Sequence, residues 1–74
     1  MADDFASIGV DDLILSAAAS LASLGYAKLE ANDLAQAKQA IDALQSLLPH
    51  VGDAQRPDLQ QALTGLQVAF VTAS

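Results

Sequence analysis

The chain has 74 residues and no cysteine, and its nine acidic residues against three Lys and Arg give a net charge of -6 at pH 7. This charge argues against binding to nucleic acids or anionic membranes, because both attract Lys and Arg. The lack of cysteine excludes disulfides and thiolate metal sites, and one histidine is too few for a protein-built zinc site. A chain this short with 53% hydrophobic residues is therefore expected to gain stability by association.

Residues 1–74 are expected to form one helical domain that opens with a loose acidic arm. The arm covers residues 1–9, MADDFASIG, and chain ends that nothing ties down are usually poorly ordered. Its acidic start does not match the positively charged start of a secretion signal. We therefore expect a cytoplasmic location.

The first helix is expected over residues 10–30, which are almost all Leu, Ile, Ala and Ser. Asp11 and Asp12 lie in its first turn, where carboxylates favour the positive end of the helix dipole. Adjacent side chains on a helix point about 100° apart and do not converge on one substrate atom. The acidic pair is therefore interpreted as a helix start and not as a catalytic pair.

The apolar residues of this helix form two stripes. The stripe expected to face the core consists of Val10, Leu13, Ile14, Ala17, Leu21 and Leu24. The second stripe consists of Leu15, Ala18, Ala22, Tyr26 and Leu29. Two neighbouring helices cannot cover both stripes, so the second is predicted to be an interaction surface. The uncharged run over residues 13–27 is shorter than the roughly 20 residues that a membrane span needs, so no span is expected.

A second helix is expected over residues 33–48. Asp33 fits its N-cap with Gln36 three residues later, and Asn32 is an alternative cap one residue earlier. Apolar residues then recur every three or four positions, which indicates an amphipathic helix. Pro49 disfavours helical backbone at the residue before it. His50 is interpreted as a loop or capping residue, because no nucleophile or orienting group accompanies it.

A third helix is expected over residues 57–72, with Pro57 at its first position. Gly65 lies outside its inward face and weakens the helix by about 1 kcal/mol relative to Ala. Val68 and Val71 also point away from that face and extend the predicted interaction surface. The fold class is therefore all-α, a three-helix bundle completed by oligomerisation or by docking on a larger assembly.

A family resemblance is found in two runs, LILSAAASLASLG at 13–25 and DLAQAKQAIDALQSL at 33–47. A weaker match covers residues 57–71. On them the chain resembles a bacterial family known only as domain of unknown function 1844. The resemblance implies a short, all-helical bacterial protein and transfers no catalytic residue. Such proteins typically carry a Lys-Thr-rich connector where this chain has PHVGDAQRP, and arginines near Gln67 and Ala69. Functions that depend on those cations are not expected here.

Two functions follow from these patterns. The first is protein–protein interaction, as a homo-oligomer or as an accessory subunit of a larger complex. The alternative is a carrier or sensor of a small apolar ligand, with the second stripe lining a pocket and Tyr26 as its polar group. No enzyme and no cofactor are expected, because the serines of the first helix have no base beside them.

Overall fold

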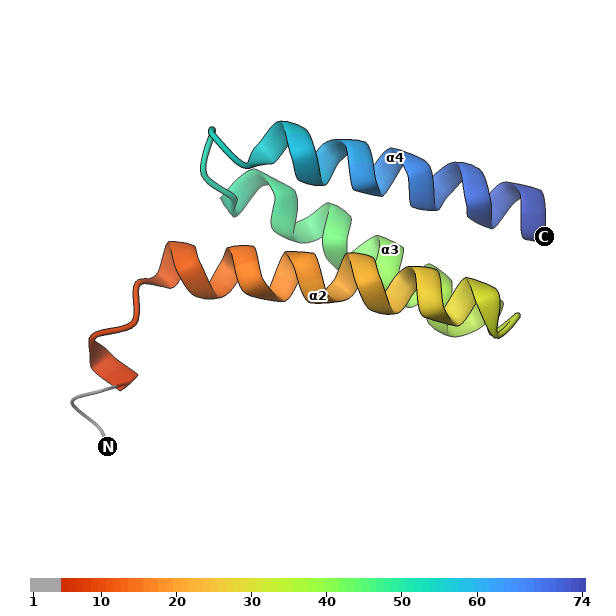
Figure 1. Cartoon of the computed structure of the whole chain (residues 1–74), viewed down its shortest axis with the longest axis horizontal. Helices are drawn as coiled ribbons and strands as arrows, with labels where there is room; N and C mark the ends of the chain where they lie inside the picture. The colour runs from red at the N-terminus through yellow and green to blue at the C-terminus, as the bar shows by residue number, and fades with distance from the viewer. Residues whose placement is uncertain (1–4) are drawn as a thin grey trace.

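The computed structural model describes residues 5–74, which form a bundle of three long helices (Figure 1). Helix α2 spans Val10–Glu30, α3 spans Leu34–Leu47 and α4 spans Arg56–Ala73. A short 3-10 helix, η1, follows α3 at Leu48–His50. The described residues contain no strand. The predicted all-α, three-helix fold is therefore confirmed.

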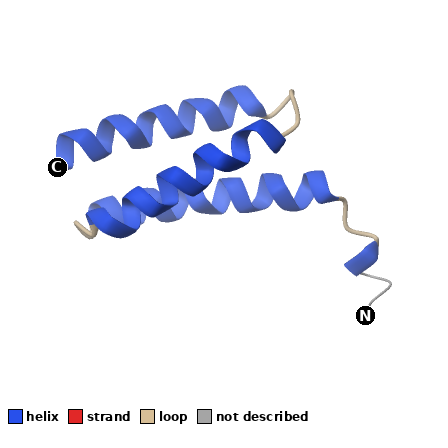
Figure 2. Ribbon diagram, turned by 180° about the vertical axis from the view of Figure 1, so that it is seen from behind, coloured by secondary structure: helices blue, strands red, loops and turns tan. Residues whose placement is uncertain are grey.

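The helices are arranged so that one side of α2 has no neighbouring helix within residues 5–74. Helices α2 and α4 run side by side, and α3 runs obliquely from the end of α2 to the start of α4, behind α2 in Figure 1 and in front of it in Figure 2. The molecule is elongated and flat, with principal extents of 45 × 26 × 15 Å and a radius of gyration of 13.6 Å. A compact domain of this length would have a radius of gyration of about 11 Å. A flat arrangement of three helices leaves the outer side of each helix in contact with solvent.

The core lies where the three helices meet. Leu44 of α3 and Leu66 of α4 are its largest fully buried side chains. The contribution of α2 is made of small residues, namely Ala18, Ala22 and Gly25. A Cβ atom at Gly25 would lie only 3.1 Å from Leu66 Cδ2 and 3.6 Å from Ala40 Cβ. Glycine at this position therefore lets α3 and α4 approach the α2 backbone closely.

The turn between α2 and α3 is closed by backbone hydrogen bonds around one left-handed residue. Asn32 has a φ of 60°, and its N–H donates to the carbonyl of Leu29 at 3.0 Å. The next N–H, of Asp33, donates to the carbonyl of Lys28 at 2.8 Å, which completes a Schellman motif. Asp33 then starts α3, because its Oδ1 accepts from the N–H of Gln36 at 3.2 Å. Of the two predicted N-caps, the structure uses Asp33.

Replacing Asn32 by Gly is expected to stabilise the fold, and replacing it by Ala to destabilise it by about 1 kcal/mol. Left-handed backbone is free of strain only for Gly, is tolerated by Asn, and brings the Cβ of other residues too close to the backbone. Urea unfolding followed by far-UV circular dichroism should rank the midpoints Gly above Asn above Ala. The same midpoint for all three variants would contradict the left-handed assignment of this residue.

The connection between α3 and α4 is held by one arginine. Arg56 Nη2 donates to the carbonyl of Val51 at 2.7 Å, and its Nε donates to the carbonyl of Leu48 at 3.3 Å. Its Nη1 also lies 2.8 Å from Asp53 Oδ1. These contacts tie the end of η1 to the start of α4, which begins one residue before the predicted Pro57. The guanidinium therefore has a structural role in this loop.

Candidate functional site

The structure turns the predicted second stripe of α2 toward the core. Ala18 is 0% exposed and Ala22 is 8% exposed, and both belong to the central hydrophobic cluster. Leu15 and Leu29 are half-buried and pack against the same cluster. The prediction that this stripe stays uncovered is therefore wrong for these four residues. Only Tyr26, at 42% exposed, is open to solvent as predicted.

Residue size explains why this stripe faces the core. Small residues at a helix contact allow the two axes to come closer, and closer axes bring more atoms into contact. On α2 these residues are Ala18, Ala22 and Gly25, and on α3 they include Ala37 and Ala40. A comparison of hydrophobicity alone favours burial of the opposite stripe, because that stripe contains more Leu and Ile.

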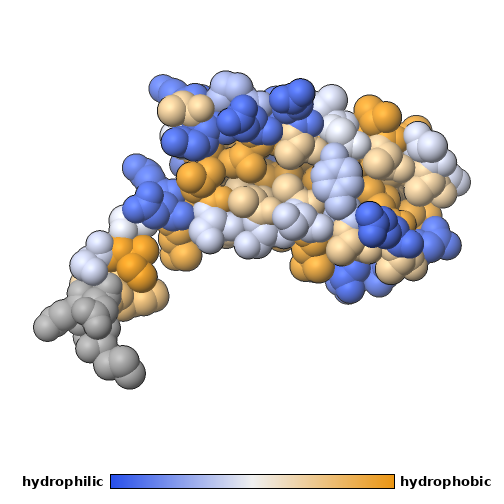
Figure 3. All heavy atoms as spheres, viewed as in Figure 1, coloured by the Kyte–Doolittle hydropathy of each residue, from blue (hydrophilic) through white to orange (hydrophobic). Residues whose placement is uncertain are grey.

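The stripe expected to face the core lies mostly on the outside. Val10 is 70% exposed, Leu13 is 55% exposed and Leu24 is 50% exposed, whereas Ile14 and Leu21 are half-buried. We name the exposed apolar and small residues along this side of α2 the outer seam. The outer seam consists of Val10, Leu13, Ala17, Ser20, Leu24 and Ala27, all exposed. In Figure 3, apolar surface alternates with weakly polar surface along α2.

Two other exposed apolar groups lie near the ends of the helices. Phe5 and Ile8 are exposed and line a hollow with Val10 and Leu13 at the start of α2. This part of the predicted arm therefore extends the outer seam, while residues 1–4 of the arm lie outside the described residues. Val68 and Val71 are exposed on α4, as predicted, and line a separate shallow hollow there.

Tyr26 is placed by a glycine of the neighbouring helix. A Cβ atom at Gly65 of α4 would lie 2.6 Å from the hydroxyl oxygen of Tyr26. The phenol of Tyr26 therefore extends from α2 to α4, where Gly65 has no side chain to block it. From the sequence, Gly65 is expected only to weaken the helix. Its role was missed because a helical wheel does not show which residue of another helix lies opposite.

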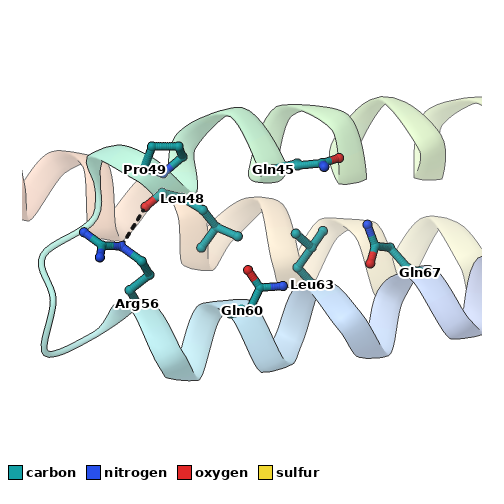
Figure 4. Close-up of a pocket in the computed structure, with 7 residues that line it drawn as sticks. All are labelled: Gln45, Leu48, Pro49, Arg56, Gln60, Leu63 and Gln67. Carbon is teal, nitrogen blue, oxygen red and sulfur yellow. Dashed lines mark hydrogen bonds between the residues drawn. The ribbon is translucent and has the colours of Figure 1, made fainter.

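A groove between α3 and α4 is lined by three glutamines, three apolar residues and one arginine (Figure 4). Its lining residues are Gln45, Leu48, Pro49, Arg56, Gln60, Leu63 and Gln67. Glutamine amides supply neither a general base nor a nucleophile at neutral pH. Figure 4 also shows the Arg56 guanidinium turned to the carbonyl of Leu48, away from the three glutamines. This groove therefore offers hydrogen bonds and no catalytic group.

Within residues 5–74, metal binding would require clustered ligands, and membrane insertion would require a long apolar helix. Within this range, no group of three or more His, Asp or Glu residues is placed to hold a metal ion. Helix α2 is long and apolar enough to cross a membrane, by length and composition alone. A buried core helix and a signal sequence near the N-terminus pass the same test, and 17% of the apolar window of α2 is buried, including Ala18, Ala22 and Gly25.

The outer seam is thus the candidate site that the geometry provides. No protein-family model, no curated protein and no solved structure matches the chain. The resemblance to domain of unknown function 1844 therefore stays a prediction.

Proposed function

We propose that the chain functions by binding another protein molecule through the outer seam of α2, as a homo-oligomer or as a subunit of a larger complex. The observation that carries this proposal is the exposure of Val10, Leu13 and Leu24 on a helix whose other side packs into the core. Burying a Val or Leu side chain completely contributes about 1.5–3 kcal/mol relative to leaving it exposed. Burial of such a row of side chains against a partner therefore strongly favours association.

The distribution of charge supports the same function. The chain has a net charge of -6, yet α2 has no charged residue between Asp12 and Lys28, the stretch that contains most of the outer seam. Centres of protein interfaces are depleted of charged side chains, and larger exposed apolar patches mark binding sites. The outer seam combines both properties on one helix.

The small-ligand alternative has less support. It required a pocket along the second stripe, and Ala18 and Ala22 of that stripe lie in the hydrophobic core. Tyr26, its expected polar group, lies against Gly65 of α4. An elongated, exposed row of side chains fits the surface of another macromolecule better than it encloses a small molecule.

The proposal can be tested by co-purification of tagged and untagged chains from the same cells. Leu24→Asp introduces a charge in the outer seam, and the matched control Gln61→Asp introduces the same charge at an exposed position of α4. We expect wild type and Gln61→Asp to recover the same partner in equal amounts. Leu24→Asp should recover at least roughly tenfold less, because a carboxylate in an interface centre has no partner there.

Two results would contradict the proposal. Light scattering on the purified chain and mass spectrometry of the co-purified material show whether anything is bound. A monomer with no co-purified protein would contradict it. Equal recovery by Leu24→Asp, with the far-UV circular dichroism spectrum unchanged, would place the interaction elsewhere on the chain.

A further inference from the structure

We propose that Tyr26 and Gly65 form a latch that holds the last two turns of α4 on α2, and that these turns are released when the phenol leaves its position. Tyr26 lies outside the outer seam, so the latch stands independently of the proposed function. It is supported by a reciprocal fit between two glycines and two large side chains, and by the position of the polar contacts of α4.

Helices α2 and α4 each insert one large side chain at a glycine of the other. Leu66 of α4 lies at Gly25 of α2, where a Cβ atom would come within 3.1 Å of Leu66 Cδ2. Tyr26 of α2 lies at Gly65 of α4, where a Cβ atom would come within 2.6 Å of the phenol oxygen. In each helix the glycine and the large residue are neighbours in the sequence. The two insertions therefore form one contact, which fixes where the helices meet.

The two insertions differ in how firmly they are held. Leu66 is 0% exposed and belongs to the central hydrophobic cluster. Tyr26 is 42% exposed, and its hydroxyl makes no hydrogen bond within residues 5–74. Rotation about the Cα–Cβ bond moves such a ring to another staggered position without opening the core. The phenol is therefore the movable half of the contact.

Among residues 5–74, polar contacts join α4 to its surroundings only at its start. Arg56 donates to the carbonyls of Leu48 and Val51. After Arg56, the side-chain hydrogen bonds of α4 all end within the helix itself. Leu66 is the last buried residue of α4, and the residues after it are half-buried or exposed. Segments with few buried contacts open at low free energy, so the last two turns depend on the latch.

A double-mutant cycle tests whether the phenol and a side chain at Gly65 exclude each other. At an ordinary exposed helix position, replacing Gly by Ala raises the folding equilibrium constant about fivefold. We expect Gly65→Ala to lower the urea midpoint instead, because the new methyl group displaces the phenol. Tyr26→Phe removes only the oxygen, and the ring carbon that bore it lies 3.9 Å from the Cβ position. Tyr26→Phe alone should match wild type, and the double variant Tyr26→Phe, Gly65→Ala should exceed it.

Tyrosine fluorescence tests whether the phenol moves. Tyr26 is the only tyrosine and the chain has no tryptophan, so the emission reports this position alone. Gly65→Ala should raise the acrylamide quenching constant about twofold, because a ring that is 42% exposed turns fully into water. Gln61→Ala, at an exposed position of α4, is the matched control and should leave the constant unchanged.

Hydrogen exchange tests whether the phenol holds α4. Amides of residues 67–73 should exchange at least roughly tenfold faster in Gly65→Ala than in wild type, because local opening exposes them to water. Amides of residues 59–63, close to the Arg56 contacts, should keep their rates. The double variant Tyr26→Phe, Gly65→Ala should restore slow exchange. Tyr26→Ala removes the phenol without adding a methyl group, and it should release the same residues even if Gly65→Ala does not fold.

Three results would overturn the latch. A higher urea midpoint for Gly65→Ala than for wild type would show that the phenol and the methyl group fit together. Stronger quenching with unchanged exchange of residues 67–73 would show that the phenol moves without holding α4. Exchange of these residues at the unprotected rate in wild type would show that the last two turns are not held at all.

Discussion

Replacing Ala18 by Asp is expected to unfold the chain, whereas the same replacement at Ala17 is expected to leave it folded. Ala18 is 0% exposed in the core, and a carboxylate there has neither water nor a cation beside it. Burying an unpaired charge costs several kcal/mol, and a domain of this length has a total stability of roughly 4–11 kcal/mol. Ala17 belongs to the exposed outer seam, where water solvates the new charge.

The two substitutions control for one another. Both replace Ala by Asp in the interior of α2, so both lose the same helix propensity, and only the direction of the side chain differs. Far-UV circular dichroism and urea unfolding at low protein concentration measure the difference. If Ala17→Asp unfolds the chain and Ala18→Asp does not, the face predicted from the sequence is the one inside, and the outer seam is not a surface.

Replacing Leu44 by Ala is expected to lower the free energy of unfolding by about 2–5 kcal/mol. Leu44 is fully buried between the helices, so the truncation removes apolar contacts and leaves a cavity. Leu13→Ala removes the same atoms from a side chain that is 55% exposed. We expect it to cost less than about 1 kcal/mol in the monomer, because surface substitutions have small effects. Urea midpoints for the two variants at the same low concentration give the comparison.

The stability losses of Leu13→Ala and Leu44→Ala should depend differently on protein concentration. A partner that binds only the folded chain stabilises it by mass action. If the chain is a homo-oligomer, the difference in unfolding free energy between wild type and Leu13→Ala should therefore grow as protein concentration rises. Leu44→Ala should show its full loss of unfolding free energy even in dilute solution. Equal losses for the two variants in dilute solution would mean that Leu13 is as well packed as Leu44, contrary to the structure.

The local features of the chain were predictable because they depend on neighbouring residues. Helix α2 covers the range expected from its composition, and α3 begins after Asp33, whose carboxylate accepts from the N–H of Gln36. The end of α3 came within a residue of its expected position, and Pro49 lies in the short helix η1 that follows. Capping, proline geometry and helical periodicity all act within about one turn, so a single sequence contains the information.

Contacts between helices were not predictable in the same way. Gly65 makes room for Tyr26, and Arg56 binds the carbonyls of Leu48 and Val51 across the loop. Each of these roles depends on which residues of two separate segments come together. The pattern of either segment alone does not contain that information.

The sequence by itself determined that α2 is a long helix with two apolar stripes and that three helices cannot cover both. Only the tertiary structure decided which stripe is covered. The stripe with Ala18, Ala22 and the adjacent Gly25 lies inside, and Val10, Leu13 and Leu24 lie outside. The reason is steric, because helices pack closest where their side chains are smallest. A count of apolar residues measures hydrophobicity and does not predict the distance between helix axes.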